Sequence, residues 1–391
     1  MKIGILTFHR PINYGAYLQA FSLSNKLKEC LTGANVEIID YISPKEKRNI
    51  YINILRDIKH GGITGGIRGI KKKKAFSNSY SKLMLSKKKL CTNNLEKLYQ
   101  LIDENYDCLV IGSDAIFNWN QTGFPTPFIP NRHFTIPVLA YAASVHGMKF
   151  YEVGSDKIQK CKEAFQQFSL IGTRDFCTEQ FVKFCDSSCN PVHCCDPTVF
   201  IDTNKLRVLA GDYKQRIKKK YGVSLNKKYI VIMSPDSALT DEIARHYGKD
   251  YTIIHVFEGA SDDCRFLYDL TPFEWAEVLA HASVVITRFF HGTLLSLVHG
   301  TPAIVLDYSK YTGKYESKLK DLMVTRFNLP ELYYDMEYAQ GFNSMAHNNF
   351  ITLLNKVLSG EYHERIMDAI SIERKTGLDY IDALKHLLNK Q

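Results

Sequence analysis

Short apolar runs of strand length alternate with helix-patterned segments along nearly the whole chain. The expected strands are residues 3–6, 36–41, 107–111, 138–144, 170–173, 229–233, 251–257, 284–286 and 303–306. Several of these runs are continuously apolar, as strands buried on both faces of a sheet are. Because a strand parallel to its predecessor needs a crossover, usually a helix, this alternation predicts an α/β fold built on parallel sheets.

The same alternation predicts more than one domain. A chain of 391 residues exceeds what a single core usually supports, and the pattern restarts after a basic, poorly periodic connector at 214–220. We expect two Rossmann-like domains facing a cleft, residues 1–205 and 206–365, the first with a basic insertion at about 60–90. Residues 366–391 are expected to form a helical segment that can cross back to the first domain.

One strand-turn-helix stretch, residues 283–302, concentrates polar groups at a strand end. Residues 284–286 are expected to be a buried strand and 293–298 a core-packed helix. The turn between them contains Arg288, His291, Gly292 and Thr293. Ligands of open α/β folds bind at the carboxyl ends of strands, and a helix N-terminus there offers N–H groups to an anion.

Three other strand ends carry candidate groups. Asn13, Tyr14 and Gly15 lie in the loop after the first strand, Asp114 ends the G-S-D sequence of the third, and Arg174 follows the fifth. Asn13 and Gly15 either bring backbone amides to a ligand or form an N-cap and turn. Asp114 either accepts a proton or sugar hydroxyl, or caps a helix. Arg174 either binds a ligand or pairs with a neighbour such as Asp175.

The chain carries a formal charge of +9, and part of that excess is local. Lys71 to Lys74 and Lys87 to Lys89 flank a Gly-rich and Ser-rich segment that begins near Gly61. This segment is either a solvated basic loop or a patch that rests on anionic lipid headgroups or lipid diphosphates. We expect no nucleic-acid partner, because no recognition module accompanies the charge.

The cysteines and the N-terminus predict a cytoplasmic protein with reduced thiols. Met1 leads directly into a strand-like run, and no secretory signal or apolar stretch of membrane-spanning length is apparent. Cys185, Cys189, Cys194 and Cys195 surround His193 without a paired C-x-x-C spacing, so we expect no metal site. If the lipid alternative holds, the protein rests peripherally on the inner face of the cell membrane.

Four motifs together resemble the polysaccharide pyruvyl transferase family. They are K-I-G-I-L-T-F-H-R-P-I-N-Y-G-A-Y-L-Q-A at the N-terminus, L-V-I-G-S-D-A-I-F-N, C-D-P-T at Cys195 to Thr198, and F-H-G-T-L-L-S-L-V-H-G-T-P. The resemblance covers roughly residues 1–310. It implies a GT-B-like fold, phosphoenolpyruvate as co-substrate with no other cofactor, and His291 as the catalytic residue. The implied acceptor is a sugar of a bacterial capsule or exopolysaccharide, or of its lipid-linked precursor, and the product is a cyclic pyruvate ketal.

The residues fit that chemistry. Phosphoenolpyruvate carries a phosphate and a carboxylate, which arginine binds bidentately, so Arg174 and Arg288 are donor-binding candidates, with Gly292 and Thr293 at the helix start. His291 is the expected acid for the enol carbon. We expect it to be protonated mainly in the donor complex, since a helix N-terminus disfavours an imidazolium.

The remaining candidate residues are assigned to the acceptor side or the donor side of the expected cleft. Asp114 is the candidate base for the attacking sugar hydroxyl, and Asn13, Tyr14 and Gly15 lie on the acceptor side. One departure from the family pattern concerns the donor side: several members carry arginine two residues before the histidine, where this chain has Phe289, with Arg288 one position earlier.

Two other functions are compatible with this fold. A glycosyltransferase would bind a nucleotide sugar in the same cleft and would need a ribose-binding carboxylate in the second domain, for which Glu258 and Asp307 are the candidates. A non-catalytic glycan-binding protein of the same fold would need neither the nucleotide sugar nor the ribose-binding carboxylate.

Overall fold

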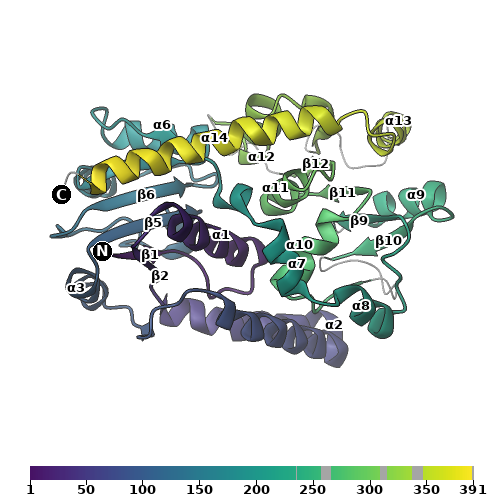
Figure 1. Ribbon diagram of the computed structural model, residues 1–391, viewed down its shortest axis with the longest axis horizontal. Coiled ribbons are helices and arrows are strands. Elements are labelled where there is room, and N and C mark those ends of the chain that lie inside the picture. The colour runs from purple at the N-terminus through teal and green to yellow at the C-terminus, as the bar shows by residue number, and fades with distance from the viewer. Residues whose placement is uncertain (235, 257–265, 309–314, 337–346, 390–391) are drawn as a thin grey trace.

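The computed structural model describes residues 1–234, 236–256, 266–308, 315–336 and 347–389. Two parallel sheets lie side by side along its long axis (Figure 1). The first has the order β2-β1-β5-β6-β7-β8. Its strands are β1 (Lys2–Leu6), β2 (Asn35–Ile38), β5 (Cys108–Asp114), β6 (Val138–Ala143), β7 (Phe168–Thr173) and β8 (Val192–His193).

The second sheet has the order β10-β9-β11-β12-β13. Its strands are β9 (Tyr229–Met233), β10 (Thr252–His255), β11 (Val284–Thr287), β12 (Ala303–Asp307) and β13 (Tyr333–Asp335). Strand β9 pairs in parallel with β10 and β11, and β11 with β12. The predicted α/β class with parallel sheets is therefore confirmed.

Helices cover both sheets. The longer ones are α1 (Tyr14–Cys30), α2 (Pro44–Ser79), α3 (Leu95–Asn105), α5 (Ser155–Phe165), α6 (Phe176–Cys185), α7 (Thr203–Ala210), α8 (Tyr213–Tyr221), α9 (Ser237–Tyr247), α10 (Pro272–Ala280), α11 (Phe290–Val298), α13 (His347–Leu358) and α14 (His363–Leu388). Short elements are β3 (Tyr41–Ile42), β4 (Leu90–Cys91), α4 (Trp119–Thr122), α12 (Lys318–Lys320), and the single turns 80–82, 150–152, 197–200, 321–326 and 330–332.

Local signals placed some element ends correctly and missed others. The capping box of Thr271 and Glu274 starts α10 as predicted. The expected strand 36–41 is instead broken into β2 and β3. The expected connector 214–220 is helix α8, because Tyr213 and Ile217 bury one face of an otherwise charged turn. The expected helix 315–323 shrinks to α12 and a following π-helical turn.

The first part of the basic segment is helical, so the loop alternative is wrong for residues up to 79. Lys71 to Lys74 lie in α2, and Lys87 to Lys89 directly precede β4. The glycines that suggested a loop instead allow close helix packing, since a Cβ on Gly66 would lie 2.5 Å from the Ile58 side chain. Among the described residues, no helix is both long and apolar enough to cross a membrane.

Contacts between the two sheets are extensive. Tyr14 at the start of α1 stacks on Trp275 of α10, with ring centroids 4.9 Å apart. The closing helix α14 runs along one side of the molecule past both sheets (Figure 1). Its Tyr380 hydroxyl donates a hydrogen bond of 2.6 Å to the carbonyl of Ala140 in β6. One continuous cluster of buried apolar side chains therefore spans both halves.

Candidate active site

Helix α11 starts earlier than its sequence suggested, and this places His291 in its first turn. Strand β11 ends at Thr287, and Phe289 is the N-cap with an extended backbone. The Thr287 hydroxyl accepts a hydrogen bond of 3.0 Å from the amide of Phe289. His291 thus lies at the carboxyl end of a central parallel strand, where ligands of such sheets bind.

The N-terminal loop meets His291 directly. Gly15 lies in the first turn of α1, and a Cβ atom there would be 2.1 Å from Nδ1 of the imidazole. Only glycine allows this approach. The structure therefore brings together two segments that the sequence placed on opposite sides of a cleft.

The other ring nitrogen of His291 faces a carboxylate. Nε2 lies 3.4 Å from Oδ2 of Asp196, whose side chain is 1% exposed. Asp196 follows β8 and caps the turn 197–200, where its Oδ1 accepts hydrogen bonds from the amide and hydroxyl of Thr198. Burial alone would raise the pKa of Asp196, but His291, Arg174 and Thr198 lower it far below its ordinary value. Asp196 is therefore ionised.

Arg174 extends this pair into a chain of charges. One guanidinium nitrogen donates to Asp196 at 2.7 Å and another to Asp114 at 3.2 Å. Its side chain is 1% exposed, and its Nε has no hydrogen-bond partner among the described residues. The pairing partners are these two carboxylates; Asp175 instead caps α6 by accepting from Thr178.

Asp114 lies at the end of β5, as expected. Burial opposes its ionisation, but the charges of Arg174, His291 and Lys318 outweigh that effect and lower its pKa to about 2. A carboxylate with such a low pKa is a weak base for a sugar hydroxyl. Its position beside Arg174 suits an electrostatic partner better than a proton acceptor.

Lys318 joins the same cluster, and sequence reasoning missed it. Its ammonium lies 5.3 Å from the centroid of the Phe290 ring, which also contacts the Arg174 guanidinium at 4.4 Å. Burial and the charge of Arg174 lower the pKa of Lys318 to about 8. The Lys318 charge in turn lowers the pKa of His146 to about 4. No local motif marks Lys318, since α12 is three residues long.

A pocket of about 460 Å³ opens beside this cluster. Its lining comes from the start of α6 in the first half and from residues 315–326 in the second. The lining residues are Asp175, Phe176, Cys177, Tyr315, Glu316, Lys318, Asp321, Thr325 and Arg326. Its volume is within the range of small-molecule sites. A cleft between the halves, with Lys318 in its wall, is therefore present.

The other predicted donor residues lie in and around the first turn of α11. Arg288 places its guanidinium 5.3 Å from the centroid of its neighbour Phe289. Gly292 is buried, and a Cβ there would lie 2.8 Å from the Thr287 hydroxyl. Thr293 is fully buried, and its hydroxyl donates to the Phe289 carbonyl at 3.0 Å. Donor binding by these three residues stays a prediction.

The loop residues before Gly15 have structural contacts. Asn13 is the N-cap of α1, and its side chain accepts from the amide of Ala16 at 3.2 Å. The Tyr14 hydroxyl donates to the carbonyl of Leu270 at 3.2 Å, in addition to the stacking on Trp275. Their contact with an acceptor stays a prediction, while Tyr14 clearly joins the two halves.

The remaining sequence candidates that the structure describes have other contacts. Asp307 is buried, and its carboxylate accepts hydrogen bonds from Ser317 and Tyr333; Glu258 lies outside the described residues. Cys194 is buried, and its sulfur accepts from the amide of Ala142 at 3.1 Å. Within the described ranges, no group of three or more His, Cys, Asp or Glu is placed to hold a metal ion.

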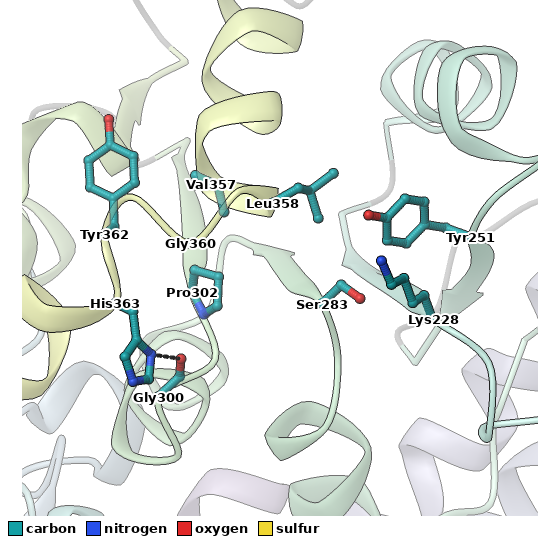
Figure 2. Close-up of a pocket in the computed structure, with 10 residues that line it drawn as sticks. All are labelled: Lys228, Tyr251, Ser283, Gly300, Pro302, Val357, Leu358, Gly360, Tyr362 and His363. Atoms are coloured by element: carbon teal, nitrogen blue, oxygen red, sulfur yellow. Dashed lines mark hydrogen bonds between the residues drawn. The ribbon is translucent and has the colours of Figure 1, made fainter.

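A second pocket, of about 230 Å³, lies at the other edge of the second sheet (Figure 2). Lys228, Tyr251, Ser283 and Pro302 line it, and they immediately precede β9, β10, β11 and β12. The amino ends of parallel strands are opposite to the edge where ligands of such sheets bind. This second pocket is therefore at the edge of the sheet opposite to His291.

A family model described as polysaccharide pyruvyl transferase matches residues 13–310, which include Gly15, Asp114, Arg174, Asp196 and His291. No curated protein matches this sequence.

Among solved structures, the chain is similar to several UDP-GlcNAc 2-epimerases. The enzyme of Neisseria meningitidis bound to UDP-GlcNAc has 10% identity and a TM-score of 0.58, with 100% of both chains covered. A putative UDP-N-acetylglucosamine 2-epimerase of Listeria monocytogenes has 9% identity and a TM-score of 0.56, with 100% of this chain and 97% of that one covered. At such low identity the similarity establishes the fold, which is GT-B-like.

Proposed function

This chain belongs to the polysaccharide pyruvyl transferase family, and from that premise we propose that it moves the pyruvyl group of phosphoenolpyruvate onto a sugar as a cyclic ketal. The family indicates a transferase of polysaccharide biosynthesis, so a sugar or polysaccharide is the acceptor class. The donor, the product and the roles below are the proposal.

The observation that carries this proposal is the pairing of His291 with Asp196 at 3.4 Å. An imidazole held at one nitrogen by a buried carboxylate has a fixed orientation, as in catalytic triads. Nε2 is buried and lies at ion-pair distance from Asp196 without a hydrogen bond to a described residue, and in this proposal Nδ1, beside Gly15, passes the proton to the ligand. This arrangement supports a general-acid role for His291.

The proposed reaction starts with a proton from His291 to the methylene carbon of phosphoenolpyruvate. The enol carbon becomes an oxocarbenium-like centre, and a sugar hydroxyl attacks it and loses its proton. Inorganic phosphate then leaves with the electron pair of its carbon–oxygen bond. A second hydroxyl of the same sugar closes the ketal and loses its proton. One of the two hydroxyl protons restores His291, and the other leaves with inorganic phosphate.

Positive charge for the donor comes mainly from Lys318. Arg174 is already paired with two carboxylates, so it offers little net charge, together with an Nε–H that has no hydrogen-bond partner among the described residues. The Lys318 ammonium, in the wall of the pocket, is the better partner for a phosphate or carboxylate. Asp114 in this proposal holds Arg174 in place instead of accepting the hydroxyl proton, because its pKa is too low for a base.

A thermal-shift comparison tests the donor. We expect phosphoenolpyruvate to raise the melting temperature in a concentration-dependent way, and UDP-sugars to have no effect. The His291→Ala variant should retain this shift. Stabilisation by UDP-sugars alone would instead identify a glycosyltransferase, and no response to either ligand would favour a glycan-binding protein.

The product is tested in cells that make the polysaccharide. Mass spectrometry of the glycan should show a pyruvate ketal when the wild-type gene is present and none when it is deleted or carries His291→Ala. A ketal in the His291→Ala strain would remove this residue from the mechanism.

A further inference from the structure

Helix α2 reverses direction at its middle and forms a helical hairpin. Gly62 has φ 59° and ψ −154°, a backbone conformation that only glycine adopts readily. A Cβ on Gly65 would lie 2.2 Å from the carbonyl oxygen of Asp57, eight residues earlier. Lys73 likewise lies 3.9 Å from the centroid of the Tyr51 ring. A straight helix would separate these pairs by roughly 12 and 33 Å.

One face of each arm is apolar and exposed. The first arm exposes Tyr51, Leu55 and Ile58 at 52%, 63% and 43%, and the second exposes Ile63, Ile67 and Ile70 at 82%, 46% and 57%. Each set has the i, i+4, i+7 spacing of one helical stripe. Scattered exposed residues need no explanation, but six on one hairpin form a patch of the kind that marks an interaction surface.

The apolar stripe of the second arm points away from the body of the protein. The second arm is attached through Arg68, which lies 5.6 Å from the Phe266 ring, and through Phe76, which packs on Tyr14. On a helical wheel these residues lie opposite Ile63, Ile67 and Ile70. On the second arm the stripe lies roughly a third of a turn from the glycines that face the first arm, and on the first arm Tyr51 and Ile58 border the seam, against Lys73 and Gly66. Since the arms are antiparallel, both stripes come to the same side of the hairpin.

The hairpin also carries most of the net charge of the chain. Residues 44–79 contain ten Lys and Arg and two Asp and Glu, a net charge of +8 compared with +9 for the whole chain. Lys45, Lys47, Arg48, Lys71 and Lys74 are exposed. An apolar stripe bordered by lysine and arginine is the composition of helices that lie in the headgroup region of anionic bilayers.

We propose that the α2 hairpin docks this protein on the surface of an anionic phospholipid bilayer, with its isoleucine stripe in the headgroup region and its lysines on lipid phosphates. The charge favours this occupant over a second copy of the chain, because two hairpins of charge +8 repel each other. In Figure 1, α2 lies along one long edge of the molecule, below α1. Its second arm packs through Lys72 on Tyr14, next to the Gly15–His291 contact.

Vesicle co-sedimentation of the full chain tests the surface. We expect binding to vesicles of phosphatidylcholine with phosphatidylglycerol, none to phosphatidylcholine alone, and release by high salt. Ile63→Asp with Ile67→Asp should abolish binding, and Lys71→Gln with Lys74→Gln should weaken it about tenfold or more. The matched control is Ile372→Asp, at a 68% exposed position of α14, which should bind as the wild type does.

Two outcomes would overturn the proposal. Equal binding by the isoleucine variant and the wild type would mean that the stripe does not insert. A wild-type dimer that the isoleucine variant converts to monomer, without vesicle binding by either, would assign the stripe to a second copy. Because these measurements need no donor or acceptor, they are independent of the proposed transferase reaction.

Discussion

Gly15 lies directly against the imidazole of His291: a Cβ atom on this glycine would be 2.1 Å from Nδ1 and 2.3 Å from Cγ of the ring. The first turn of α1 and the first turn of α11 therefore form one surface, although they belong to different sheets. The position of His291 depends on how the two halves pack, and each half alone lacks this arrangement.

Gly15→Ala should displace the imidazole while the protein stays folded. A methyl group at this point must push the ring or separate α1 from α11, and a shift of about 1 Å of a catalytic group costs roughly 100-fold in rate. We expect kcat to fall by about that factor, measured as phosphate release from phosphoenolpyruvate. The control is Gly154→Ala, where a Cβ meets no atom within 4 Å. Equal rates for the two variants would contradict the role of the close contact.

Asp196→Asn should disturb the orientation of His291 without weakening donor binding, so the two roles can be distinguished. The amide keeps the size of the side chain but removes the charge beside Nε2, and loss of the analogous carboxylate in catalytic triads lowers kcat by up to about 10⁴-fold. We expect a fall in kcat of about 10²-fold or more, with phosphoenolpyruvate affinity retained or increased. Asp202→Asn, at the exposed N-cap of α7, is the matched control. A change in affinity alone would assign Asp196 to donor binding.

Lys318→Met should weaken donor binding, because it removes the ammonium from the pocket wall. Loss of one charge-assisted contact corresponds to roughly a 30- to 100-fold rise in Kd. In the wild type, binding of phosphoenolpyruvate should weaken as the pH rises through about 8, where Lys318 loses its proton. In Lys318→Arg this loss should move to higher pH, as titration calorimetry can show. A pH-independent affinity in the wild type would remove Lys318 from the donor site.

Acid stability should report on Asp114. Its pKa is about 2 in the folded protein and 3.8 ordinarily, so ionised Asp114 stabilises the fold above pH 4 and this contribution is lost as the pH falls from about 4 to 2. The shift corresponds to roughly 2 kcal/mol. Asp114→Asn should therefore flatten the fall in free energy of unfolding over this range, measured by urea denaturation. An unchanged slope would show that the Arg174 pair does not stabilise Asp114.

Part of this site follows from local pattern. The apolar run 284–286 followed by a helix-forming sequence places His291 at a strand end, and the G-S-D sequence does the same for Asp114. Asp196 lies in the C-D-P-T motif but was not among the predicted site residues. An acidic residue before proline at a strand end is nevertheless a signal that the sequence provides. Lys318 carried no such signal.

The sequence by itself determined the alternation of strands and helices, the class of fold and the position of His291 at a strand end, because periodicity and caps act over a few residues. Only the tertiary structure decided that Gly15 and Asp196 meet His291 and that Arg174 meets Asp196, since such contacts depend on how the chain packs. The same reason explains the error over α2. Its glycines predict a loop when considered locally, but packing of one arm on the other offsets their low helix propensity.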